Sequence, residues 1–134
     1  MLYSGISSNS TPNDYNATGC LYLGDINLND SDVCKETLQI YDKYFQNMYT
    51  VQVPHHGSPT GYNPQFWKKV KTARNNSVGI ISHAKSSRSH PNKKVLIDLM
   101  AYISRHSVTE DPISQYSQKI KLYNLHGSNL GTNS

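Results

Sequence analysis

Two adjacent histidines, His55 and His56, stand where the chain leaves a predicted strand. Pro54 ends that strand because proline has no N–H for sheet pairing, and Gly57 makes the following loop adaptable. Neighbouring side chains point in different directions, so one imidazole can bind a metal ion while the other faces a substrate or a supporting group. The alternative is a pair of solvent-exposed loop histidines, which the tripeptide alone does not exclude.

A carboxylate follows another predicted strand. Asp25 comes directly after Gly24 and the apolar run Gly19–Leu23, which places its side chain at an end of the predicted sheet. A carboxylate in such a place can hold a hard or borderline cation. The competing interpretation is an ordinary turn aspartate.

A third candidate precedes a predicted helix. His90 is followed by Pro91, which favours the first turn of a helix. Backbone N–H groups and the helix dipole favour an anion there, so His90 could contact a phosphate or carboxylate oxygen of a substrate. A histidine without function at a cap is the alternative. We expect the remaining histidines to lie on the surface: His83, His106 and His126.

Several common signatures of hydrolases and zinc sites do not occur in the sequence. It contains no His-x-His-x-Asp-His, His-Glu-x-x-His, Cys-x-x-Cys or Gly-x-Ser-x-Gly segment and no phosphate-binding loop. The histidine pair and Asp25 must therefore be interpreted through the elements that position them.

Apolar spacing predicts three helices between short strands. After a cap at Asp30 or Ser31, apolar residues recur every three or four positions over 34–48, as in a helix packed on a sheet. Asn63 followed by Pro64 predicts the second helix start. The predicted strands are Met1–Ile6, Gly19–Leu23, Tyr49–Val53 and Val78–Ser82, with a closing hairpin of Val108 and Ile120–Tyr123.

The resulting order, β-β-α-β-α-β-α-β-β, is typical of an α/β fold. In such folds the strands hold the backbone rigid, and the loops at their ends present side chains from separate parts of the chain to one cleft. We therefore expect Asp25 and His56 to meet at one cleft, with His90 on its rim.

Composition limits the possible classes of protein. A chain of 134 residues suffices for one domain, and its net charge of +4 weakly favours an anionic partner. The two cysteines, Cys20 and Cys34, cannot form a disulfide framework and are expected to be free and buried. No apolar stretch predicts a membrane span or an export signal, so we expect no membrane insertion and, by default, a cytoplasmic location.

Four segments carry a combined pattern: Cys20-Leu-Tyr-Leu-Gly-Asp25, Val51-Gln-Val-Pro-His-His-Gly-Ser58, Ile80-Ile-Ser82 and Ser89-His-Pro91. Together they resemble metallo-β-lactamase-fold hydrolases of the ComEC type, the relatives of the nuclease-like domain of bacterial DNA-uptake channels. The resemblance implies the C-terminal half of an αββα sandwich over residues 1–125, followed by a polar tail over residues 126–134.

The resemblance also implies a role for each candidate. Asp25 matches the aspartate that bridges two metal ions, and one histidine of the pair, with His56 favoured, matches a histidine ligand. His55 would face the reacting group, and Ser58 and His90 would contact the substrate. Two Zn²⁺ or Mn²⁺ ions in such sites activate a water and polarise a scissile ester or phosphodiester. Nucleic acid or another phosphoester is the implied substrate.

The sequence also departs from the family pattern. The family's His-x-His-x-Asp-His cluster lies upstream of the Gly-Asp strand, which is already the second predicted element here. We therefore expect the N-terminal metal-binding half to be missing or supplied by another chain, and the isolated chain to be inactive. The alternative function is a non-catalytic module that keeps the fold and binds an anion or a protein. Half of a two-sheet sandwich would expose an apolar sheet face, which should pair with another surface.

Overall fold

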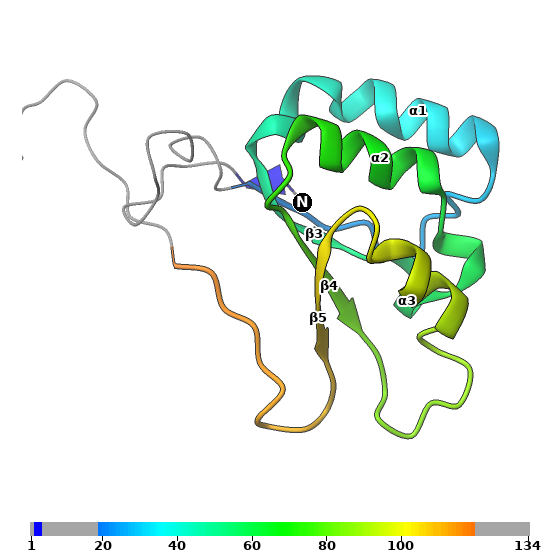
Figure 1. The fold of residues 1–134 in the computed structure, drawn as a ribbon, viewed down its shortest axis with the longest axis vertical. Coiled ribbons are helices and arrows are strands. Elements are labelled where there is room, and N and C mark those ends of the chain that lie inside the picture. Colours follow the sequence, from blue (N-terminus) through cyan, green and yellow to red (C-terminus); the bar gives the residue numbers. More distant parts are fainter. Residues whose placement is uncertain (1, 4–18, 120–134) are drawn as a thin grey trace, which may run out of the picture.

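The computed structural model describes residues 2–3 and 19–119, which form one five-stranded sheet covered by helices on one face (Figure 1). The strands are β1 (Leu2–Tyr3), β2 (Gly19–Leu21), β3 (Met48–Gln52), β4 (Val78–Ser82) and β5 (Ser104–Val108). The α-helices are α1 (Ser31–Tyr41), α2 (Pro64–Ala73) and α3 (Lys93–Leu99). Short 3-10 helices span Asp42–Asn47, Pro54–Gly57 and Pro59–Gly61. The chain is thus mixed α/β, which is the fold class that the sequence predicts.

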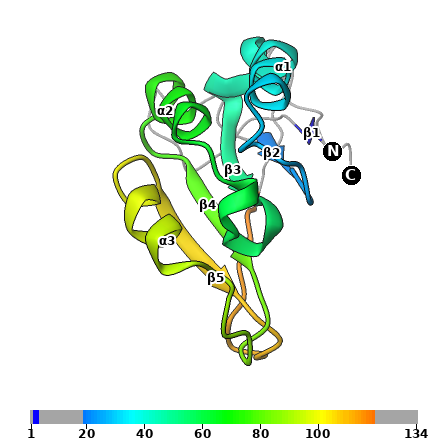
Figure 2. The same ribbon diagram turned by 90° about the vertical axis from the view of Figure 1, so that its right-hand side faces the viewer.

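The strands follow their chain order in the sheet, from β1 to β5. β1 pairs antiparallel with β2, whereas β2, β3, β4 and β5 run parallel to their neighbours. The three α-helices make the crossovers between the parallel strands, and all of them lie in front of the sheet in Figure 2. The carboxyl ends of the four parallel strands consequently share one edge.

Polar side chains start the first two α-helices where the sequence predicts a cap. The Asp30 carboxylate accepts hydrogen bonds from the N–H groups of Asp32 and Val33 at 2.9 and 3.2 Å. Asn63 accepts from the Gln65 N–H at 2.9 Å, and Pro64 occupies the first turn. These bonds satisfy N–H groups that have no partner inside the helix.

The hydrophobic core lies between the sheet and the helices. Phe66 and Trp67 of α2 are fully buried and pack edge-to-face, with ring centroids 5.2 Å apart. Alternate strand residues such as Val51 and Ile81 reach the same core. The apolar faces predicted for the first two helices are therefore the ones that pack, although the first helix ends at Tyr41 and continues as a 3-10 turn.

Two predicted elements are wrong in detail. The third helix begins at Lys93 rather than at Pro91, because the Asn92 side chain caps it by accepting from the N–H groups of Lys94 and Val95. Val108 does not open a hairpin: it ends β5, which pairs parallel with β4. The predicted strand Ile120–Tyr123 and the tail over residues 126–134 lie outside the described residues.

The described residues cover only part of the sheet face opposite the helices. Residues 109–119, orange in Figure 1, run along it. Within this segment the Tyr116 hydroxyl lies 3.0 Å from the Thr50 hydroxyl, and the Gln118 side-chain oxygen accepts from Thr50 at 2.6 Å. A hollow of about 390 Å³ remains beside these contacts. The sequence analysis expects an apolar face here, whereas the face carries polar side chains such as Thr50 and Gln52 beside apolar ones such as Ile80.

The two cysteines occupy different environments. Both are free, and Cys34 is buried in the core as predicted, but Cys20 is only half-buried on the helix-free face. Burial raises the pKa of both thiols above the ordinary value of 9.0. Both are therefore thiols rather than thiolates at neutral pH. In the part of the chain that the structure describes, no helix has the length and apolarity needed to span a bilayer.

Candidate functional site

Asp25 and His55 meet at the carboxyl edge of the sheet, and His56 is the next residue of the same loop. A direct approach of Asp25 to His56 stays a prediction. Asp25 lies just beyond β2, and His55 and His56 lie just beyond β3, which is the neighbouring parallel strand. The Nδ1 atom of His55 lies 4.0 Å from a carboxylate oxygen of Asp25. The His55 backbone N–H also donates to the Gly24 carbonyl at 3.1 Å, which joins the two loops directly.

The Asp25–His55 pair is open to solvent. The side chains are 75% and 32% exposed, respectively, so water and salt screen their attraction. Such a pair contributes little to folding stability. Its oxygen and nitrogen atoms remain accessible to a ligand from solution.

The backbone of the histidine loop, Pro54–Gly57, adopts an uncommon conformation. The φ angles of His55, His56 and Gly57 are 49°, 56° and 78°. Only glycine adopts such values without steric cost, and each histidine pays about 1–2 kcal/mol for them. Strained non-glycine residues concentrate at sites where function requires a particular side-chain direction.

The His56 ring is oriented by the backbone of another strand. Its Nδ1 lies 2.6 Å from the carbonyl oxygen of Ser82, at the end of β4. A carbonyl can only accept, so Nδ1 carries the proton and the neutral ring has its lone pair on Nε2. A carbonyl bond to one ring nitrogen is the common arrangement around a metal-binding histidine. His56 is exposed, and its Nε2 is therefore a suitable metal donor.

The segment that contains His90 packs against the histidine loop. The contacts are made by Pro91 and Asn92, the two residues that follow His90. A Cβ added at Gly57 would come within 2.7 Å of the Pro91 Cβ, and the Asn92 N–H donates to the Gly57 carbonyl at 3.0 Å. The Nδ1 atom of His90 is buried and has no hydrogen-bond partner among the described residues. The structure thus places the loop that carries His55 and His56 beside the loop that carries His90.

His90 does not lie at the helix start, as predicted, and its binding of an anion stays a prediction. The residue lies before the helix cap, and the Asn92 oxygen already accepts from the first N–H groups of α3. The His90 N–H itself donates to the Ser87 hydroxyl at 3.1 Å. Any contact of His90 with a substrate would therefore involve its imidazole ring.

Ser58 is placed at the same edge, but its hydroxyl is engaged locally. The side chain is nearly buried, lies 2.9 Å from the Thr60 hydroxyl and accepts from the Thr60 N–H at 3.3 Å. These contacts hold the short 3-10 helix Pro59–Gly61. Substrate binding by Ser58 stays a prediction.

Tyr62, which follows the 3-10 helix Pro59–Gly61, bonds to α3. The Tyr62 hydroxyl donates to an Asp98 carboxylate oxygen at 2.6 Å. Desolvation by burial, followed by the bond to Asp98, raises the pKa of Tyr62 above its usual value. The phenol therefore keeps its proton, and the loop keeps this anchor, throughout the neutral range.

Two supporting groups were missed by sequence reasoning. The Ser82 carbonyl that orients His56 has no sequence signal, because any residue supplies a carbonyl. Gln52 accepts the N–H groups of Leu23 and Gly24 on its side-chain oxygen, at 3.0 and 2.8 Å. A polar side chain at the end of β3, beside the Gly-Asp turn, was a signal that could have identified Gln52.

The remaining histidines have local partners. The His83 Nδ1 lies 3.1 Å from the Ala84 carbonyl oxygen at the same sheet edge. His106 is half-buried rather than on the surface, and its Nε2 lies 2.9 Å from the Gln115 carbonyl oxygen, which helps to hold residues 109–119. His126 lies outside the described residues.

Within residues 2–3 and 19–119, no group of three or more histidine, cysteine or carboxylate side chains is arranged to hold a metal ion. No protein-family model, curated protein or solved structure matches this chain. The interpretation of the carboxyl edge therefore rests on its residues and their geometry.

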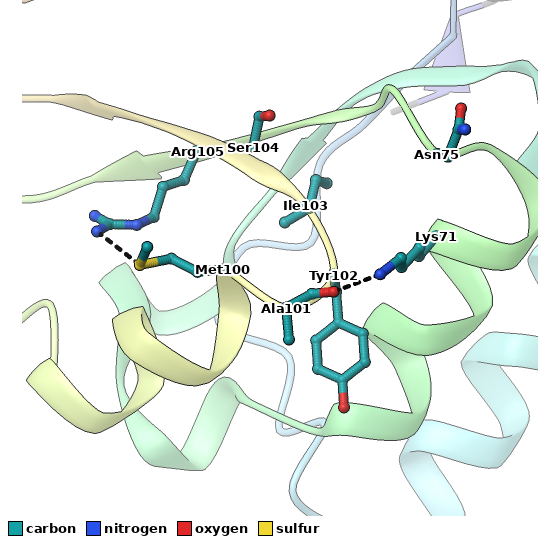
Figure 3. A pocket seen from close by; sticks show the side chains of 8 residues that line it. All are labelled: Lys71, Asn75, Met100, Ala101, Tyr102, Ile103, Ser104 and Arg105. Atoms are coloured by element: carbon teal, nitrogen blue, oxygen red, sulfur yellow. Dashed lines mark hydrogen bonds between the residues drawn. The ribbon is translucent and has the colours of Figure 1, made fainter.

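A second hollow, of about 710 Å³, lies near the start of β5 and is shown in Figure 3. Two cationic residues line it, but each has a structural explanation. The Lys71 ammonium donates to the Ala101 carbonyl at 2.7 Å, where the turn after α3 leaves carbonyls without partners. Arg105 lies on β5, the last strand of the described sheet, where a charged side chain discourages edge-to-edge association. This hollow is not a candidate active site.

Proposed function

We propose that this chain is part of a metal-dependent phosphoester hydrolase of the metallo-β-lactamase type. The observation that carries the proposal is the contact of Asp25 with His55 at one sheet edge, together with the neighbouring His56, whose ring is oriented by the Ser82 carbonyl. A carboxylate and an imidazole with a free lone pair are donors that suit Zn²⁺ or Mn²⁺. When bound, such ions supply Lewis-acid chemistry at the scissile phosphoester.

The protein groups have distinct roles in this proposal. Asp25 and the Nε2 atom of His56 hold metal, and the bond to Ser82 keeps the ring directed outward from the loop. His55, beside Asp25, faces the reacting group and can exchange a proton with it. The His90 imidazole and Ser58 contact the substrate from the adjoining loop.

Asp25 and His56 are too few for two ions, because catalytic zinc has about three protein ligands per ion. We therefore propose that the remaining ligands come from another polypeptide, and that this chain alone is inactive. The helix-free sheet face supports a sandwich in which a second sheet packs there. Tyr22 on that face is 58% exposed, and the hollow beside it is open.

The alternative is a non-catalytic module that binds an anion or a protein. The net charge of +4 and the partly open sheet face favour it. The two proposals differ in their dependence on metal. Only the first requires hydrolysis to depend on His56 and on a divalent cation.

Activity measurements test the proposal. The chain would be assayed with Mn²⁺ and a chromogenic phosphodiester, alone and with a polypeptide that supplies a His-x-His-x-Asp-His segment. We expect cleavage only in the mixture. His56→Ala should lower the rate by about 100-fold or more, because a metal donor is lost. His90→Ala should mainly raise KM.

The matched control is His83→Ala, at the same edge, which should retain activity because the ring bonds to the carbonyl of the adjacent residue and the proposal gives it no role. Metal-dependent cleavage by the lone chain that survives His56→Ala would overturn the proposal. Binding of the polypeptide without any cleavage would favour the non-catalytic module.

A further inference from the structure

Gln52 connects the helix-free face of the sheet with the turn that carries Asp25. It is the last residue of β3, and its side chain lines the hollow on that face together with Tyr22 and Ile80. From there its side-chain oxygen accepts the Leu23 and Gly24 N–H groups at 3.0 and 2.8 Å. Two backbone donors from one turn thus converge on a single acceptor of the neighbouring strand.

Core packing holds the two ends of the turn, through Leu23 and Ile26, but its tip at Gly24 and Asp25 has few other contacts among the described residues. Gly24 has a φ of +56°, and a Cβ added there would meet no atom within 4 Å. Asp25 is 75% exposed, so no packing holds its side chain. Among the described residues, the Ile26 N–H donates to the Leu23 carbonyl at 3.2 Å and closes the turn itself. The His55 N–H bond to the Gly24 carbonyl and the Asp25–His55 ion pair join the turn to the histidine loop.

We propose that Gln52 is a positioning residue, which fixes the turn before Asp25 so that its carboxylate stays beside His55. The amide side chain suits this role, because its oxygen has two lone pairs and can accept two N–H groups without adding a charge next to Asp25. The proposal takes the metal-binding role of Asp25 from the proposed function, but the positioning itself does not require metal.

Amide hydrogen exchange tests the positioning. Gln52→Met keeps the length of the side chain, suits a half-buried strand, and removes the oxygen acceptor. Exchange at the Leu23 and Gly24 amides should become about tenfold faster, since each amide loses its hydrogen bond to the Gln52 oxygen. Gln52→Glu, which keeps an oxygen acceptor, should retain most of the protection.

The matched control is Gln39→Met on the exposed face of α1, which should leave both amides unchanged. A second readout is the Mn²⁺-induced broadening of the Asp25 amide signal, which Gln52→Met should weaken while the exchange of core amides in β4 stays the same. A merely structural role would speed exchange throughout the sheet.

Unchanged exchange at Leu23 and Gly24 in Gln52→Met, or equal acceleration in Gln52→Glu, would overturn the positioning role. Failure of the wild-type chain to bind Mn²⁺ at Asp25 would instead count against the proposed function, because the exchange result does not depend on metal.

Discussion

At the scale of single residues, the candidate site is defined by two histidines whose backbone is left-handed. His55 and His56 adopt φ angles of 49° and 56°, and other residues compensate for this cost. The His55 N–H donates to the Gly24 carbonyl, and the His56 ring bonds to the Ser82 carbonyl. The conformation directs one ring toward Asp25 and leaves the Nε2 atom of the other available.

This backbone conformation makes a prediction about stability. Both His55→Gly and His55→Ala remove the imidazole, but only glycine adopts a positive φ without strain. We expect the glycine variant to be more stable than the alanine variant by about 1 kcal/mol, measured by urea unfolding. The same two substitutions at His106, inside β5, should give the opposite order, because glycine weakens a strand. A less stable glycine variant at position 55 would contradict the left-handed conformation.

The identities of the candidate residues could be predicted from the sequence, whereas their geometry could not. Asp25 and His55 follow apolar strands, so their placement at a sheet edge follows from local patterns. The conformation of His56 and its bond to Ser82 depend on a backbone carbonyl 26 positions away, which leaves no local signal. The contact between Asp25 and His55, rather than His56, likewise depends on tertiary structure.

At the scale of elements, two loops pack so closely that one position must be glycine. Gly57, in the histidine loop, lies against Pro91, which precedes the cap of α3. The hydrogen bond between the Asn92 N–H and the Gly57 carbonyl ties the loops together at the same point. The orientation of the histidine loop therefore depends on α3 as well as on β3.

Two glycine substitutions test this packing. Gly57→Ala would place a Cβ 2.7 Å from the Pro91 Cβ, whereas Gly24→Ala would meet no atom within 4 Å. Both residues have a positive φ, so both variants carry a similar conformational cost of about 1 kcal/mol. We expect Gly57→Ala to lose a further 1–3 kcal/mol or so of unfolding free energy because of overpacking. Equal losses in urea unfolding would show that the loops are not in close contact.

Most elements were predictable because their signals are local. Asp30 and Asn63 cap the helices that follow them, and β4 has its predicted bounds, Val78–Ser82. The third helix was placed too early because Pro91 resembles a first-turn residue, while the cap is Asn92. The parallel pairing of β5 with β4 was missed because β5 is mostly polar, and its partner strand determines its direction.

At the scale of the whole molecule, the described chain has one layer of helices and one sheet. Its second sheet face is only partly covered by residues 109–119, through bonds from Tyr116 and Gln118 to Thr50. Gln52 lies on this face and holds the Asp25 turn. A partner on this face would thus lie next to a group that positions the candidate metal ligand.

The position at which the whole chain takes up a divalent ion tests the central claim most directly. Mn²⁺ would be titrated into the ¹⁵N-labelled chain while paramagnetic broadening of the amide signals is recorded. We predict that broadening centres on Asp25, His55 and His56, that Asp25→Asn reduces it, and that Asp32→Asn at the start of α1 does not. Broadening centred on the acidic pair Glu110–Asp111, or unaffected by Asp25→Asn, would contradict the assignment of the carboxyl edge as a metal site.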